Sequence, residues 1–197
     1  FEEQNEIFPL LQAQPPDYDA ILLHPELFVN FRNRNQQLID FLVNPENANK
    51  LFDMITSHKV IRISRIIVEL VVANRSVLLD YLLDNTELVE KMIKKVNECD
   101  PVHMGFITKI FGKALDTDNE KTKNLFFKSD DILVILTKAL SEPAVNELIL
   151  KFIQFLQDDQ MWIVLSYLEL IHRDPKVTDQ MVIDFCKKFG DFKFGRS

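Results

Sequence analysis

The sequence predicts an all-helical protein, and three observations carry this prediction. Apolar residues recur with the 3.6-residue period of helices along most of the chain, and the two-residue alternation of half-buried strands is absent. The chain has only four glycines, which leaves few positions for the tight turns of a β-rich fold. Asp100-Pro101 and Asp174-Pro175 each place a capping carboxylate before a proline at the first helical position. We therefore expect helices that are joined by short turns.

Eight apolar stripes follow one another along the chain, and each is typical of one buried helix face. The first stripe follows Asn44, which can cap a helix that Pro45 opens. In chain order the stripes are Ala48, Leu51, Phe52 and Ile55; Ile63, Ile66, Ile67 and Leu70; Leu88, Val89, Met92, Ile93 and Val96; Phe106, Ile107, Ile110, Phe111 and Ala114; Ile132, Leu133, Leu136 and Leu140; Val145, Leu148, Ile149, Phe152, Ile153 and Leu156; Met161, Trp162, Leu165 and Leu168; and Val177, Met181, Val182, Phe185 and Phe189.

A recurring phrase ends one helix and caps the next, and its spacing indicates a repeat. The four copies are Phe41-Leu42-Val43-Asn44, Tyr81-Leu82-Leu83-Asp84, Phe126-Phe127-Lys128-Ser129 and Phe155-Leu156-Gln157-Asp158. Their first residues are 40, 45 and 29 positions apart. The first two spacings lie near the ~40–47-residue period of HEAT and armadillo arrays, whereas the third is short. We therefore expect an irregular HEAT/armadillo-like helical-repeat stack, an α-α superhelix.

The domain organisation follows from where the helical pattern begins and ends. Residues 1–18 hold three of the eight prolines and little periodicity, which predicts an extended lead-in. Residues 19–189 form a single predicted helical-repeat domain, and residues 190–197 a frayed tail. No secretory signal follows Phe1, so we interpret the chain as a trimmed fragment.

Composition excludes several classes of function and location. The net charge of −7 argues against nucleic-acid binding, which requires clustered lysine and arginine. No tract approaches the ~18 uninterrupted apolar residues of a membrane span, so we expect no membrane insertion. Two cysteines are too few for a secreted disulfide framework, which favours the cytoplasm or the nucleus.

Motifs that carry chemistry are missing from the sequence. No glycine-rich phosphate loop, His-Glu-x-x-His motif or Gly-x-Ser-x-Gly elbow occurs. Cys99 and His103 are the nearest pair of potential metal ligands, but two ligands do not make a site, and we interpret them as a partly buried thiol and a helix-start histidine. Asp130-Asp131 and Asp158-Asp159 lie where helix N-termini favour negative charge. The sequence thus predicts no enzyme, no metal, no cofactor and no small-molecule substrate.

One polar concentration, residues 30–37, interrupts an otherwise apolar helical pattern. Arginines can pair with acidic groups through two parallel hydrogen bonds, and amides can bind an extended peptide. These properties make Arg32, Arg34 and Asn35 the candidate protein-binding residues. The same pattern also fits a solvated helix face whose apolar residues, Phe28 and Phe31 among them, turn toward the core. Both interpretations stay open at this stage.

From Asp19 to about Ile153 the chain resembles the SAPS family, the helical-repeat regulatory subunits associated with protein phosphatase six and its yeast relative. Asn35-Gln36-Gln37-Leu38-Ile39-Asp40-Phe41-Leu42 is similar to the family's early Asn-x-x-Leu-x-x-Phe-Leu segment. Pro101 through Gly112 is similar to a family helix that ends in Phe-x-x-Lys-x-x-Gly, and Leu125 to Leu140 to the segment that follows it. The segment from His58 to Asn74 departs from the pattern, because it lacks an acidic insertion and an aromatic-rich phrase.

This resemblance implies a divergent member that is not itself an enzyme. Such a subunit binds a serine/threonine protein phosphatase catalytic subunit of the type-six class, which holds its own metals, and directs the choice of substrates or partners. Further scaffold proteins are then additional partners. The alternative is a general HEAT- or armadillo-type adaptor that binds peptides or proteins unrelated to phosphatase.

Overall fold

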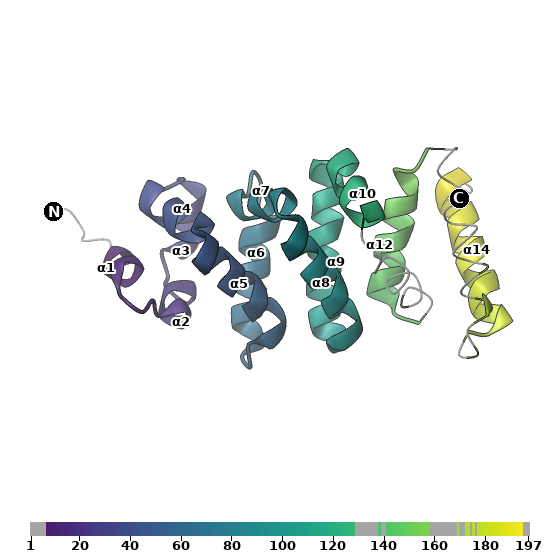
Figure 1. The fold of residues 1–197 in the computed structure, drawn as a ribbon, viewed down its shortest axis with the longest axis horizontal. Helices are drawn as coiled ribbons and strands as arrows, with labels where there is room; N and C mark the ends of the chain where they lie inside the picture. The colour runs from purple at the N-terminus through teal and green to yellow at the C-terminus, as the bar shows by residue number, and fades with distance from the viewer. Residues whose placement is uncertain are drawn as a thin grey trace. The chain divides into compact units, whose positions relative to one another are not determined.

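All regular structure in the described part of the chain is α-helical (Figure 1). The computed structural model describes residues 7–128, 138, 141–157, 169, 172, 173, 175 and 177–194. No strand occurs among these residues, so the prediction of an all-α protein is confirmed for them. The helices are α1 (Ile7–Gln12), α2 (Tyr18–Leu22), α3 (Leu27–Arg32), α4 (Gln36–Val43), α5 (Pro45–Ser57), α6 (Ile61–Val72), α7 (Val77–Asp84), α8 (Thr86–Glu98), α9 (Pro101–Thr117), α10 (Asn119–Lys128), α12 (Pro143–Gln154) and α14 (Asp179–Phe194).

The chain divides into two compact units, Phe1–Asn85 and Thr86–Ser197, where the sequence predicts a single domain over 19–189. The boundary falls between α7 and α8, which only Asn85 separates. A sequence interpretation finds no boundary there because no proline, glycine or serine run marks a linker.

The first unit packs helices around α4, which contacts α1, α3, α5 and α7. Asn44 caps α5, since its side-chain oxygen accepts hydrogen bonds from the backbone of Glu46 at 3.0 Å and Asn47 at 3.4 Å. The predicted stripe on α5 is buried, and the stripe on α6 is buried apart from the half-buried Ile66. Local periodicity therefore places both helix faces correctly.

The predicted lead-in over 1–18 is wrong for Ile7–Gln12, which forms α1. Ile7 and Leu11 are buried where α1 packs against α4. Pro9 is compatible with this helix because the backbone nitrogens of a first turn have no partner within the helix. Packing against α4 thus stabilises a helix that is too short to show a helical period in the sequence.

The second unit packs helices around α9, which contacts α8, α10 and α12. Asp100 caps α9 as predicted, with hydrogen bonds from the backbone of Val102 at 2.9 Å and His103 at 3.1 Å. Phe126 of α10 lies between two other rings, with centroids 5.0 Å from Phe111 and 5.5 Å from Phe152. The predicted stripes on α8 and α12 are buried, and that on α9 is buried apart from the half-buried Phe106.

The last helix differs from prediction at both ends. It begins at Asp179 instead of Pro175, and Thr178 Oγ1 accepts a hydrogen bond from the Met181 backbone at 3.3 Å. It reaches Phe194 and packs against α12, so the predicted frayed tail is helical over residues 190–194. The stripe of Ile132, Leu133, Leu136 and Leu140, the stripe that begins at Met161, both paired aspartates, and residues 195–197 lie outside the described residues.

Two pairs of helices have equal lengths at a constant separation. Helices α4 and α7 each have 8 residues, and α5 and α8 each have 13 residues. The second member of each pair begins 41 residues after the first. This interval is close to the 40-residue spacing of the first two copies of the recurring phrase, while the third and fourth copies extend beyond the described residues.

Candidate functional site

The predicted binding segment is a turn between two helices and not the face of one helix. Helix α3 ends at Arg32, and Arg34 adopts a φ of 53°, in the left-handed region. The Arg34 backbone N–H donates to the Phe31 carbonyl at 3.1 Å, and that of Asn35 donates to the Asn30 carbonyl at 2.9 Å. These two bonds form a Schellman motif, in which Arg34 occupies the position that usually holds glycine. The helical reading of residues 30–37 is therefore wrong.

Asn35 caps the helix that follows this turn. Its side-chain oxygen accepts hydrogen bonds from the backbone of Gln37 at 3.1 Å and of Leu38 at 3.5 Å. The phrase that resembles the early SAPS segment thus begins at a helix cap, and its apolar positions Leu38, Phe41 and Leu42 are buried. The side-chain oxygen of Asn35 is therefore engaged in capping α4.

A second turn of similar composition joins α6 to α7 in the same unit. Arg75 has a φ of 54°, close to that of Arg34, and it too precedes a capping residue. The Ser76 hydroxyl accepts a hydrogen bond from the Leu79 backbone at 3.3 Å and donates to the Leu70 carbonyl at 2.7 Å. Asn74-Arg75-Ser76 therefore corresponds to Asn33-Arg34-Asn35, which precedes it by 41 residues.

These two turns meet around a pocket of about 360 Å³. Arg34 Nη1 donates a long hydrogen bond to the carbonyl oxygen of Arg75 at 3.5 Å, which joins the turns. Apolar side chains of α3, α4 and α7 form the rest of the wall, together with three exposed arginines. The lining residues are Phe28, Phe31, Arg32, Arg34, Ile39, Ala73, Asn74, Arg75 and Val77.

The charge of this pocket is uncompensated within the described part of the chain. No acidic residue lines it, and no ion pair joins Arg32, Arg34 or Arg75 to a carboxylate among the described residues. Each guanidinium carries a full positive charge at neutral pH and presents donors in a planar fork. In a protein with a net charge of −7, these three arginines concentrate positive charge around one cavity. We call this site the arginine pocket.

The candidate residues Arg32 and Arg34 thus line one cavity, whereas Asn35 caps α4 beside it. Sequence reasoning missed Arg75, which is the third arginine that lines this cavity. The signal that could have identified it is the repeated phrase Asn-Arg-Asn and Asn-Arg-Ser at an interval of 41 residues.

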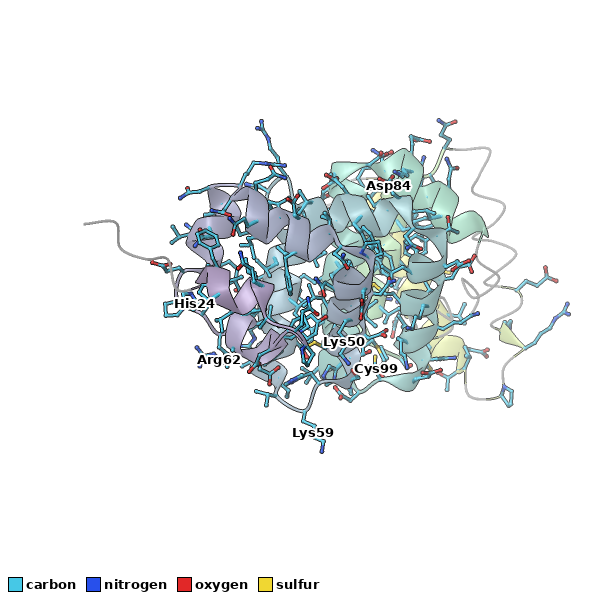
Figure 2. The ribbon with its side chains drawn as sticks, turned by 60° about the vertical axis from the view of Figure 1, so that its left-hand side comes forward. His24, Lys50, Lys59, Arg62, Asp84 and Cys99 are labelled. Carbon is cyan, nitrogen blue, oxygen red and sulfur yellow. The ribbon has the colours of Figure 1, made fainter. Side chains whose placement is uncertain are left out.

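A wider cavity of about 770 Å³ lies between the segment before α2 and the end of α5. Its lysines, Lys50 and Lys59, are accompanied by two acids, Asp17 and Asp19. His58 Nε2 lies 3.0 Å from Asp19 Oδ1. Lys59 projects outward from the turn that joins α5 to α6 (Figure 2). Because the charges are mixed, this cavity selects anions less well than the arginine pocket.

The Cys99–His103 pair is organised around a helix cap. His103 Nδ1 lies 2.6 Å from Asp100 Oδ2, while its Nε2 is buried without a hydrogen-bond partner among the described residues. Burial, with the nearby Asp100 carboxylate, raises the pKa of the Cys99 thiol. The described residues contain no group of three or more histidines, cysteines, aspartates and glutamates that could hold a metal ion.

Comparisons with known proteins give no family assignment. No protein-family model, curated protein or solved structure matches the chain. Within the described residues, every helix is too short or too polar to cross a membrane.

Proposed function

We propose that this chain is a non-catalytic scaffold of helical repeats that binds other proteins through the arginine pocket. The observation that carries this proposal is the convergence of Arg32, Arg34 and Arg75 on one cavity without an acidic partner in the described part of the chain. An unneutralised cluster of this kind favours an acidic surface or segment of another protein.

The equal helix lengths at an interval of 41 residues support the repeat architecture. In an array of stacked repeats, equivalent turns lie along one edge and create an extended binding surface. Arg34 and Arg75 occupy equivalent positions in two successive turns, and one hydrogen bond joins these turns. The pocket therefore has the position expected of a binding edge.

The proposed partner is the catalytic subunit of a serine/threonine protein phosphatase of the type-six class, and the expected location is the cytoplasm or the nucleus. The resemblance to SAPS subunits supports this choice. The Asn35–Leu42 phrase, which carries part of that resemblance, begins beside the pocket and continues into α4. The chain would direct the substrate or partner choice of the phosphatase, which supplies the metals and the chemistry. Further scaffold proteins are the additional partners.

The alternative proposal is an adaptor that binds peptides or proteins unrelated to phosphatase. Its support is that the pocket requires only an anionic group on the partner, a requirement that many proteins meet.

Binding of the purified 197-residue chain to a purified type-six catalytic subunit tests the first proposal. We expect the wild type to bind, and Arg32→Ala/Arg34→Ala to bind about tenfold more weakly or worse, because desolvated arginines are common binding hot spots. Arg62→Ala/Arg65→Ala is the matched control, since both arginines are exposed on α6 and neither lines the pocket. Figure 2 labels Arg62, which lies near the start of that helix.

The outcomes separate the proposals. Equal loss in both double variants would show that net charge, and not the pocket, governs binding. A folded wild-type chain that fails to bind the catalytic subunit contradicts the phosphatase proposal and favours the adaptor.

A further inference from the structure

We propose that the arginine pocket binds a phosphorylated serine or threonine side chain in an extended segment of a partner protein. This inference deepens the proposed function and rests on it, because it assumes that the pocket is the protein-binding contact. It names the chemical group that occupies the pocket.

The positive charge of the arginine pocket favours a phosphate over a carboxylate. Three arginines line the cavity, and no acid among the described residues lies in its wall. A phosphorylated side chain carries a charge of about −1.5 to −2 at neutral pH and three acceptor oxygens, whereas a carboxylate carries a single charge and two oxygens. The phosphate therefore neutralises more of the cluster and accepts hydrogen bonds from more of its donors.

The Arg34 guanidinium makes a long hydrogen bond from one turn to the other. Arg34 Nη1 donates to the Arg75 carbonyl oxygen, and this bond uses one of the five N–H donors of the side chain. The remaining donors are available to a ligand. An arginine that is already positioned loses less conformational entropy on binding than a free one, which favours recognition of a small anion.

The backbone of both turns is strained at an arginine. Arg34 and Arg75 both adopt the left-handed conformation, with φ of 53° and 54°. This conformation destabilises a residue other than glycine by about 1–2 kcal/mol, and such residues cluster at binding sites. Two arginines in this conformation line the same cavity, where glycine or asparagine would relieve the strain.

The size and lining of the cavity also suit a side chain of a peptide segment. Its volume of about 360 Å³ lies in the range of ligand pockets, about 300–1,000 Å³. Phe28, Phe31 and Ile39 supply apolar walls beside the arginines. Such walls can contact the side chain of a residue next to the phosphorylated one, as expected for a peptide segment.

A titration followed by NMR tests the inference with the full 197-residue chain and no phosphatase. The probe is N-acetyl-O-phosphoserine methylamide, compared with the same compound without phosphate and with N-acetylglutamate methylamide. We expect saturable shifts of the Nε–Hε signals of Arg32, Arg34 and Arg75, with binding at least about fivefold tighter than that of the glutamate compound. The signals of Arg62 and Arg65, outside the pocket, should not saturate.

Arg34→Gly/Arg75→Gly is the decisive variant, because glycine accepts the left-handed backbone and keeps the turns folded. We expect it to lose binding of the phosphoserine compound by tenfold or more, and Arg62→Ala/Arg65→Ala to retain it. Binding that persists in the glycine variant overturns the inference, as does an affinity for glutamate equal to that for phosphoserine or the absence of saturable shifts.

Failure of this inference and failure of the proposed function give different results. If the chain binds the phosphatase through Arg32 and Arg34 but does not bind the phosphoserine compound, only the inference is wrong. If it binds the phosphoserine compound but no phosphatase, the pocket is an anion site and the phosphatase proposal is wrong.

Discussion

Lys123 Nζ donates a hydrogen bond to the carbonyl oxygen of Phe155 at 2.8 Å and thereby ties α10 to the end of α12. The side chain of Lys123 is only 2% exposed, and its Nζ also lies 2.6 Å from Glu120 Oε1. A buried lysine needs such partners, because an unpaired charge in the protein interior is strongly destabilising.

Lys123→Met should therefore lower the free energy of unfolding by about 1–3 kcal/mol, since it leaves the Phe155 carbonyl without this donor. Urea unfolding followed by circular dichroism measures the change. Glu120→Gln is the matched comparison: it keeps the Lys123–Phe155 hydrogen bond but removes the carboxylate that pairs with Lys123, and it should cost less than Lys123→Met because the Glu120 side chain is 67% exposed and water screens the ion pair. Equal loss in both variants would mean that the ion pair, and not the carbonyl contact, stabilises the unit.

The lowered pKa of Asp100 predicts that the stability of the fold depends on pH. The hydrogen bonds from the His103 ring and from the His103 backbone hold the pKa of Asp100 below its usual value of 3.8. A carboxylate whose pKa is lower in the folded state stabilises the fold above its unfolded pKa, and this contribution disappears as the pH falls through the folded pKa. Wild type should therefore exceed Asp100→Ser in stability near neutral pH.

The difference between wild type and Asp100→Ser should shrink as the pH falls below about 4, because the serine keeps a capping oxygen but has no charge to lose. Thermal unfolding of both proteins across this pH range measures it. A difference that is independent of pH would assign the role of Asp100 to capping alone.

The two cysteines should differ in reactivity. Burial is the main cause that raises the pKa of Cys99, and a raised pKa lowers the fraction of reactive thiolate. Cys186 is exposed on α14. Mass spectrometry during alkylation with iodoacetamide near pH 8 should show faster modification of Cys186. Equal rates for the two cysteines after denaturation serve as the reference. Equal rates in the native protein would contradict the protection of Cys99.

Asn35→Ala separates helix capping from binding. Loss of the hydrogen bonds to the backbone of Gln37 and Leu38 should lower stability by about 1 kcal/mol, while Asn35→Asp should keep the cap. Binding of the phosphoserine compound should not change in Asn35→Ala, because Asn35 does not line the pocket. If binding falls while the fold and the pocket arginines are intact, Asn35 is a contact residue as the sequence suggests.

Local sequence signals predict most helices because their causes are local. The stripes on α5, α8 and α12 have the helical period over several turns, and Asn44 and Asp100 occupy capping positions before prolines. Each of these features depends on residues within about one turn of one another. The same reasoning fails for α1, whose single turn and a half becomes stable by packing on α4.

The candidate site could be predicted only in part, because a pocket is a long-range feature. Local polarity identifies Arg32 and Arg34, but Arg75 joins them from a turn 41 residues after that of Arg34. The sharp turn at Arg34 was also hidden, since arginine favours helices and only its backbone conformation ends α3. The sequence does not reveal the role of Lys123 either, because its hydrogen-bond partner is the carbonyl of Phe155, which is distant in the chain.

The left-handed arginines allow a prediction in which one type of substitution has opposite effects at two sites. Arg34→Gly should raise the free energy of unfolding by about 1 kcal/mol or less, because relief of backbone strain exceeds the added entropy of the unfolded chain. Arg65→Gly, at an exposed position inside α6, should lower it by about 1 kcal/mol. Urea unfolding of the two variants measures both changes. If Arg34→Gly destabilises the fold as much as Arg65→Gly, the guanidinium contact with Arg75 holds the two turns together, and its removal outweighs the relief of strain.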